Sequence, residues 1–161
     1  MKITLPDNSF RELPEGSSGY DLAKDIGPGL AKSAIAVTID GVQKDLYDVI
    51  DSDAFVSIIT IDSDEGLEIM RHTLTAQVLA RAIKNLYPKS KLAIGPTVQD
   101  GFYYDVESDE SISSDDLTSI EEEMKKIIKT KSTITKKLVS KKEACLLYTS
   151  DAADEEDSVD L

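Results

Sequence analysis

The first sixty residues alternate short β-strand candidates with one amphipathic helix, and this order constrains the fold more than any other feature. Residues 2–5 and 10–13 are separated by the turn-forming run Pro-Asp-Asn-Ser, so we expect a β-hairpin there. A helical spacing of apolar residues starts at Gly19. It stops at the Gly-Pro-Gly run of residues 27–29, because Gly can adopt a left-handed cap and Pro cannot continue a helix.

More strand candidates follow this helix. Residues 35–39 are apolar and mostly β-branched, and Asp40-Gly41 is a tight-turn signal before a return strand that starts at Val42. Residues 55–61 are another strand candidate. The order strand, strand, helix, strand, strand, strand predicts a small mixed sheet packed on one helix, as in a ubiquitin-like β-grasp.

A polar stretch at residues 62–66 separates this unit from a long predicted helix over residues 64–87. Pro88 ends this helix, because proline disfavours the helical conformation of the residue before it. The apolar residues of the helix recur every three or four positions, which predicts a stripe along one face. They are Leu67, Met70, Leu74, Val78, Ala82 and Leu86.

Shorter elements are expected after this helix. Residues 91–94 and 102–106 are strand-like and are joined by turns rich in Gly. The serine pair 113–114, followed by two aspartates, predicts the N-terminal cap of another helix. Residues 133–139 are expected to form a strand, and the Ser-x-x-Glu pattern of residues 140–143 has the form of a capping box.

Residues 145–161 differ in character from the rest of the chain. They carry several acidic residues, no base and no apolar period that would continue a helix from the capping box. A disordered acidic tail is one interpretation. We favour another, namely that this stretch is translated sequencing adapter and that the native sequence ends after about Ala144. On this interpretation no helix starts at Ser140, and Cys145 is not a candidate nucleophile.

Charge and composition exclude several classes of protein. The chain has 31 acidic and 18 basic residues and a formal charge of -13, which argues against non-specific binding to nucleic acid or anionic membranes. One Cys excludes an intramolecular disulfide and a Cys-based zinc knuckle. No apolar run reaches the roughly 20 residues of a membrane span, and the N-terminus lacks a signal-peptide pattern. We expect a soluble, cytoplasmic protein with no membrane or DNA partner.

Six segments of the sequence resemble one family. They are KITLPD, DLAKDIGPGLAKSAIAVTIDG, SIITIDSDEGLEIMRH, VLARAIKNLYP, KLAIGP and DGFYYDV. In this order and spacing they resemble the N-terminal third or less of bacterial-type threonyl-tRNA synthetases, over essentially all of residues 1–144. The resemblance implies an α+β protein in which residues 1–62 are a TGS domain with the β-grasp fold. It implies that residues 63–144 are the first part of an editing domain, which hydrolyses seryl-tRNA formed by mistake.

The resemblance also implies which functions lie outside this chain. The family consists of class II threonine–tRNA ligases that act as homodimers and bind ATP, Mg²⁺ and Zn²⁺ in a catalytic core. Neither that core nor the anticodon-binding domain corresponds to residues 1–144, so we expect an inactive fragment with no cofactor or metal site of its own. Its implied partner is tRNA(Thr). The incomplete editing domain is expected to expose apolar surface on the long helix.

The residues that the family uses for editing are altered here. A second, hydrolytic site is the general remedy when two amino acids differ by one methyl group, since a pocket discriminates that difference by only about 1–3 kcal/mol. In the family an H-x-x-x-H pair on the long helix contributes to this site. His72 matches the first histidine and Gln77 occupies the second position, whereas Thr73 lies four residues before Gln77.

His72 and Gln77 are the candidate catalytic residues, although they are five residues apart instead of four. Five steps of an α-helix amount to an offset of about 140°, so the two side chains share a face only if a π-bulge widens the helix. The alternative explanation of the spacing is a sequence error, since His and Gln codons differ only in the third base. Gln can hydrogen-bond but cannot shuttle a proton near neutral pH. We therefore predict weak or absent editing even in a completed chain.

Three further residues are candidates for substrate binding by resemblance: Thr73, Gly95 and Tyr104. Tyr103 and Tyr104 alternate along a predicted strand, so one is expected to face the core and the other a cleft. The alternative is that both tyrosines are packing residues and that Gly95 only serves the geometry of its turn.

Two other functions stay open from the sequence. One is a short, non-catalytic TGS protein that serves regulation or RNA contact. The other is a free-standing factor that hydrolyses mischarged tRNA, which is the weaker alternative because the residues that would complete its site are absent from the sequence.

Overall fold

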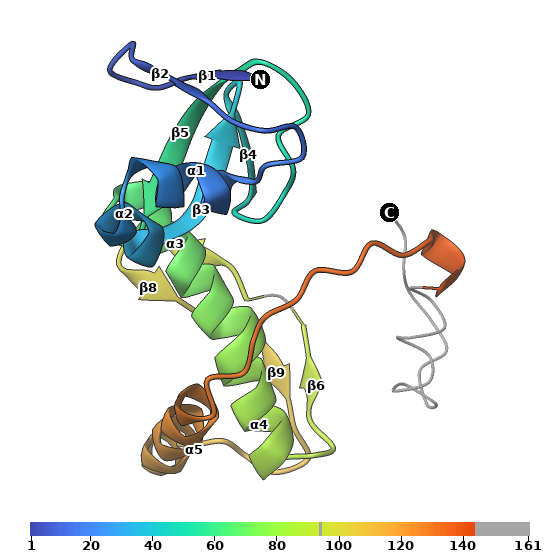
Figure 1. Ribbon diagram of the computed structural model, residues 1–161. Coiled ribbons are helices and arrows are strands. Elements are labelled where there is room, and N and C mark those ends of the chain that lie inside the picture. The colour runs from blue at the N-terminus through green and yellow to red at the C-terminus, as the bar shows by residue number, and fades with distance from the viewer. Residues whose placement is uncertain (94, 144–161) are drawn as a thin grey trace. The chain divides into compact units, whose positions relative to one another are not determined.

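The structure is a computed structural model of the 161-residue chain and describes residues 1–93 and 95–143. The chain divides into two compact units, residues 1–129 and residues 130–161. The first unit begins with a β-sheet and continues into a long helix (Figure 1).

Five strands form the sheet of the N-terminal region: β1 (Lys2–Thr4), β2 (Phe10–Glu12), β3 (Ala34–Ile39), β4 (Val42–Asp45) and β5 (Ala54–Thr60). Their order is β2-β1-β5-β3-β4. Strands β1 and β5 are parallel, and the other described pairs of this sheet are antiparallel. The prediction of a mixed sheet with the β-grasp arrangement is confirmed.

Two tight turns set the register of the hairpins. Between β1 and β2, Asn8 adopts a φ of +64°, and the carboxylate of Asp7 accepts hydrogen bonds from the N–H and the hydroxyl of Ser9 at 2.9 and 2.6 Å. Between β3 and β4, Asp40 and Gly41 both have positive φ, as a two-residue type I′ turn requires. The Asp-Gly signal in the sequence therefore has a direct structural cause.

Helix α1 (Gly19–Ile26) covers the sheet, and the short helix α2 (Pro28–Ser33) follows it. Ser18 and Asp21 form a capping box, in which each side chain accepts a hydrogen bond from the backbone N–H of the other residue. The apolar face of α1 enters a core made of Ile3, Leu5, Leu13, Leu22, Val37, Ile39, Ile50 and Val56. Burial of these side chains is the main force that holds the sheet and the helix together.

The long helix consists of α3 (Asp64–Thr73), the π-helical turn η1 (Leu74–Leu79) and α4 (Ala80–Leu86). It starts at a Ser63 cap, whose hydroxyl accepts a hydrogen bond from Gly66 N–H at 3.0 Å. The predicted boundaries are confirmed to within one residue. Part of the apolar stripe is exposed, as expected: Leu67 by 45%, Met70 by 38% and Leu86 by 38%.

Two short ladders follow: β6 (Lys91–Leu92) pairs with β9 (Val106–Glu107), and β7 (Thr97–Val98) pairs with β8 (Gly101–Phe102). The prediction of one strand over residues 102–106 is wrong. Its two ends pair with different partners, and residues 103–105 between them are not in a strand. Residue 94, the end of the first predicted strand, lies outside the described residues.

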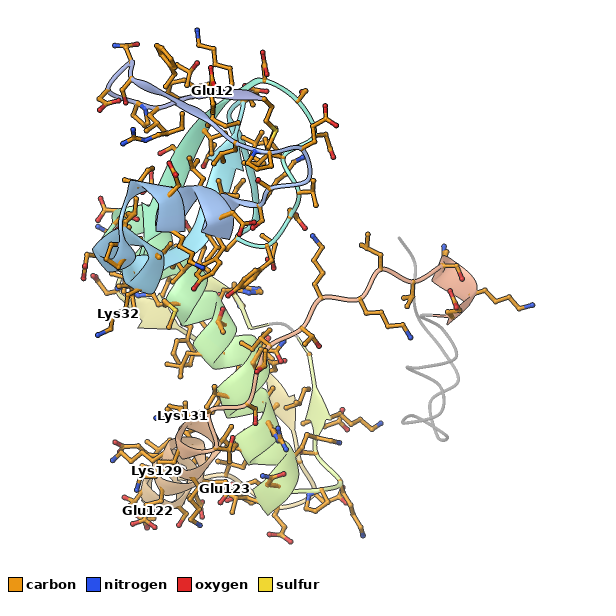
Figure 2. All side chains as sticks on the ribbon, viewed as in Figure 1. Glu12, Lys32, Glu122, Glu123, Lys129 and Lys131 are labelled. Atoms are coloured by element: carbon orange, nitrogen blue, oxygen red, sulfur yellow. The ribbon has the colours of Figure 1, made fainter. Side chains whose placement is uncertain are left out.

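The predicted helix after the serine pair is present. Ser113 and Asp116 form a capping box at the 3₁₀ turn η2 (Ser114–Asp116), which leads into α5 (Leu117–Lys129). Glu123 lies on the side of α5 that faces α4, where its carboxylate accepts a hydrogen bond from Asn85 Nδ2 at 2.8 Å (Figure 2). Ile120 of α5 is 5% exposed, so this helix buries an apolar contact as well.

In the second unit, the prediction of a strand over residues 133–139 is wrong. These residues form no ladder with the described residues, and Ile134 and Leu138 are 64% and 88% exposed. A strand needs a neighbour for its backbone N–H and C=O groups.

The capping box of residues 140–143 does form. Glu143 accepts hydrogen bonds from the N–H and hydroxyl of Ser140, and residues 141–143 are helical. The expectation that no helix starts here is therefore wrong for the first turn. Ala144, Cys145 and the proposed adapter stretch lie outside the described residues.

Candidate functional site

The π turn η1 changes the winding of the long helix next to the predicted catalytic residues. Ala80 N–H donates to the carbonyl of Thr75, five residues earlier, instead of four as in an α-helix. Where α3 meets η1, Leu74 N–H is shared between the carbonyls of Met70 and Arg71. A π turn accommodates one extra residue in a helix, which is the bulge that the spacing of His72 and Gln77 requires.

Hydrogen bonds of Thr75 and Arg71 stabilise this turn. Thr75 is 1% exposed, and its Oγ1 donates to the carbonyl of Arg71 at 2.8 Å. The side chain of Arg71 reaches the β7–β8 turn, where Nη1 donates to the carbonyl of Gln99 at 2.5 Å. Arg71 thus makes one hydrogen bond within the helix, by its backbone carbonyl, and one to the hairpin, by its side chain.

Gly95 and Tyr104, two of the predicted binding residues, are brought together. A Cβ on Gly95 would lie 2.5 Å from Cε2 of Tyr104 and 2.9 Å from Cγ2 of Thr75. The tyrosine ring therefore lies directly on the glycine backbone, next to the methyl group of the buried threonine. This close approach gives Gly95 a packing role, which differs from the turn-geometry role that the alternative interpretation of the sequence gave it.

The other predicted residues lie on the long helix. His72 and Gln77 are exposed, and Thr73 is half-buried at the start of η1. Exposed side chains at these positions are accessible to a ligand. Gln77 accepts and donates hydrogen bonds, whereas His72 carries an imidazole, the side chain that most often transfers protons in catalysis.

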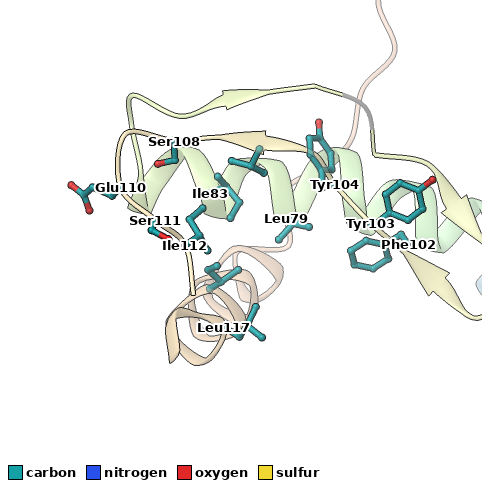
Figure 3. Close-up of a pocket in the computed structure, with 12 residues that line it drawn as sticks. Leu79, Ile83, Phe102, Tyr103, Tyr104, Ser108, Glu110, Ser111, Ile112 and Leu117 are labelled. Atoms are coloured by element: carbon teal, nitrogen blue, oxygen red, sulfur yellow. The ribbon is translucent and has the colours of Figure 1, made fainter. Parts of the chain in front are cut away.

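A cavity of about 520 Å³ lies between the long helix, the β8–β9 segment and α5 (Figure 3). Its apolar wall includes Leu79 and Ile83, and the aromatic run 102–104 forms one side. Ser108, Glu110 and Ser111 line it as well. The described lining includes Tyr104 and does not include His72, Thr73, Gln77 or Gly95.

Tyr103 and Tyr104 both line this cavity. The strand period of two, on which the prediction of opposite faces rested, does not apply because residues 103–105 are not in a strand. Tyr104 is half-buried and Tyr103 is 56% exposed.

A smaller cavity of about 270 Å³ adjoins the end of α4 and is lined in part by Tyr87. Removal from water raises the pKa of this phenol, and the carboxylate of Asp116, with which it shares a hydrogen bond, raises it further. The phenol is therefore protonated near neutral pH. It can donate a hydrogen bond there but cannot act as a general base.

Sequence reasoning missed Thr75, Arg71 and the cavity. An α-helical period places Leu74 on the buried stripe, so nothing in the pattern indicates that Thr75 is the buried residue. The cavity did leave a signal: Ile112 precedes the Ser113 cap and Leu117 is the fourth residue after it, the spacing of a hydrophobic staple. Both residues line the cavity.

No group of three or more His, Cys, Asp or Glu that could hold a metal ion occurs among residues 1–93 and 95–143. Within the same residues, no helix is long and apolar enough to cross a membrane.

A comparison with protein-family models identifies the N-terminal region. Residues 1–60 match the model of the TGS domain. The match ends at Thr60, the last residue of β5, so it covers the whole five-stranded sheet and helices α1 and α2. The β-grasp region of residues 1–60 is therefore a TGS domain.

Proposed function

We propose that this chain is the N-terminal part of a threonyl-tRNA synthetase, in which the TGS domain precedes the first part of an editing domain. The TGS domain is compatible with this function and with other translation-related proteins. The observation that carries the proposal is the π turn η1. It lies at the point where the chain has one residue more than the family pattern, between the segments ending at His72 and starting at Val78.

The proposed reaction is hydrolysis of the ester bond of seryl-tRNA(Thr). Such a site needs a group that positions water and donors that stabilise the developing oxyanion. His72 is exposed on the helix and would position the water, and Gln77 would supply a hydrogen bond where the family has a second histidine. Because the amide of Gln77 cannot take up a proton, we propose that editing is weak.

The first experiment is an independent determination of the coding sequence across codons 71–78 and across the junction of codons 144 and 145. The expected result is a reading frame that continues past codon 144 into a class II core. The protein encoded by that frame is then assayed for ATP-dependent charging of tRNA(Thr) with threonine and for deacylation of seryl-tRNA(Thr). Absence of charging by the folded protein would overturn the proposal.

A non-catalytic TGS protein that contacts RNA is the second candidate. The replacement of a histidine by Gln77 favours it, because the described residues then hold only one imidazole. A reading frame that encodes Cys145 to Leu161 and stops would support this candidate. Binding of the 161-residue chain to tRNA, compared with a DNA duplex of the same length, would then test it.

A further inference from the structure

The π turn contains a buried hydroxyl that the proposed function does not use. Thr75 is 1% exposed, and both branches of its side chain have a partner. Its Oγ1 donates to the carbonyl of Arg71, and its Cγ2 lies beside Gly95. A polar side chain buried inside a helix is costly unless its hydrogen bond is made, so this bond is a candidate determinant of the local winding.

The bond lies where the winding changes. The carbonyl of Arg71 accepts from Leu74 N–H, three residues later, and also from the hydroxyl of Thr75. Farther along the turn, Ala80 N–H reaches back five residues to the carbonyl of Thr75. The hydroxyl therefore supplies a donor at the junction where the regular spacing of four is lost.

We propose that Thr75 is a positioning residue that holds the π turn and thereby brings Gln77 onto the face of the helix that carries His72. In a continuous α-helix the two positions are about 140° apart, and a π turn narrows this offset because it takes up one extra residue. The consequence for hydrolysis rests on the proposed function of the site. The proposed geometry of the helix does not depend on that function.

The side chain of Arg71 anchors the junction of α3 and η1 to the β7–β8 turn. Its guanidinium is hydrogen-bonded to the carbonyl of Gln99 in the β7–β8 turn. The residue whose carbonyl Thr75 binds is thus fixed to the hairpin. Removal of the Thr75 hydroxyl is expected to abolish the π turn, while the hydrogen bond of Arg71 to Gln99 stays in place.

Metal chelation tests this geometry without tRNA. His72 is the one histidine of the chain, so Gln77→His creates a single pair of imidazoles five residues apart. If the π turn aligns them, the 161-residue variant binds Cu²⁺-iminodiacetate about a hundredfold more tightly than the Gln77→His/His72→Ala control, because the second ligand binds intramolecularly. Equal affinity of the two proteins would overturn the proposal.

Two substitutions at Thr75 in the Gln77→His background isolate the hydroxyl. Thr75→Ser keeps it and is expected to keep the chelate, whereas Thr75→Val keeps the branched shape and is expected to lose most of the gain in affinity. Circular dichroism establishes that each variant is folded. A folded Thr75→Val protein with full chelation overturns the proposal, and so does a folded Thr75→Ser protein without it.

Deletion of Leu74 provides a control that remains informative if Thr75→Val does not fold. The deletion removes the extra residue, so the two imidazoles are four apart in a regular α-helix and chelate without a π turn. In that background Thr75→Val is expected to leave the affinity unchanged. A loss of affinity there would show that the hydroxyl acts on something other than the π turn and would overturn the proposal.

Discussion

The ring of Tyr104 lies against the backbone of Gly95, so closely that a Cβ on Gly95 would come within 2.5 Å of Cε2. The same Cβ would lie 2.9 Å from the methyl group of Thr75 on the π turn. Gly95, which lies between β6 and β7, is therefore the point at which this connection contacts both the aromatic run 102–104 and the long helix. The lack of steric space for a Cβ explains the glycine here.

We predict that Gly95→Ala destabilises the fold by about 1–3 kcal/mol, because the added methyl group overpacks the contact with Tyr104. Gly101 is the matched control: nothing lies within 4 Å of a Cβ at that position. Urea unfolding of the two variants and the parent measures the difference. A Gly95→Ala protein as stable as Gly101→Ala would contradict the contact.

A second prediction concerns the packing of α5 on the long helix. Ile120 is 5% exposed, whereas Ile128 on the same helix is 54% exposed. We expect Ile120→Ala to cost about 2–5 kcal/mol, since it removes a buried side chain and leaves a cavity. Ile128→Ala is the control and should change the free energy of unfolding far less. Thermal unfolding followed by circular dichroism compares the two, and equal losses would show that α5 is not packed in this way.

A third prediction concerns the core of the TGS domain. Leu22 of α1 is fully buried in the cluster that joins the helix to the sheet. Leu22→Ala is expected to destabilise the domain by about 2–5 kcal/mol. Val42→Ala on the edge strand β4, where the side chain is 59% exposed, should have little effect. Hydrogen exchange of the β3 and β5 amides reads out this domain specifically, and unchanged protection in Leu22→Ala would refute the prediction.

Local signals account for most of what the sequence predicted correctly. The Asp40-Gly41 turn, the Ser113 cap and the proline after α4 each act through their own backbone or side chain. Such features need no knowledge of distant residues, so their positions agree with the structure to within one or two residues.

The wrong predictions concern segments whose structure depends on residues far away in the sequence. Residues 102–106 have strand propensity at every position except Asp105, yet the two ends pair with different strands and residues 103–105 are not in a strand. Residues 133–139 have the same propensity and form no ladder with the described residues. Propensity indicates that a segment fits a sheet, but pairing depends on a neighbour elsewhere in the chain.

The site was predictable only in part for the same reason. The count of five residues from His72 to Gln77 identified the need for a bulge, and the π turn is present there. The role of Thr75 depends on the carbonyl of Arg71 and on Gly95, which is twenty residues away in the sequence. No spacing within the helix could reveal that contact.

The last prediction is a dependence of stability on pH that originates at the start of α1. Hydrogen bonds from the backbone N–H and the hydroxyl of Ser18, in that order, lower the pKa of the Asp21 carboxyl from its ordinary value of 3.8. The ionised form is thus favoured in the folded state. Its stabilising contribution is present above the ordinary value and is lost as the pH falls through the lowered pKa of the folded protein.

Asp21→Asn is expected to flatten the loss of TGS-domain stability between about pH 5 and pH 2, because the substituted side chain no longer titrates. Ser18→Ala removes the hydroxyl that binds the carboxylate and should reduce the same slope in part. Asp100→Asn, in the turn between β7 and β8, changes the net charge equally without touching a helix cap, and it serves as the control. Thermal unfolding of the four proteins across this pH range measures the slopes. If Asp21→Asn and Asp100→Asn flatten the curve equally, the effect comes from net charge and the capping box does not contribute to it.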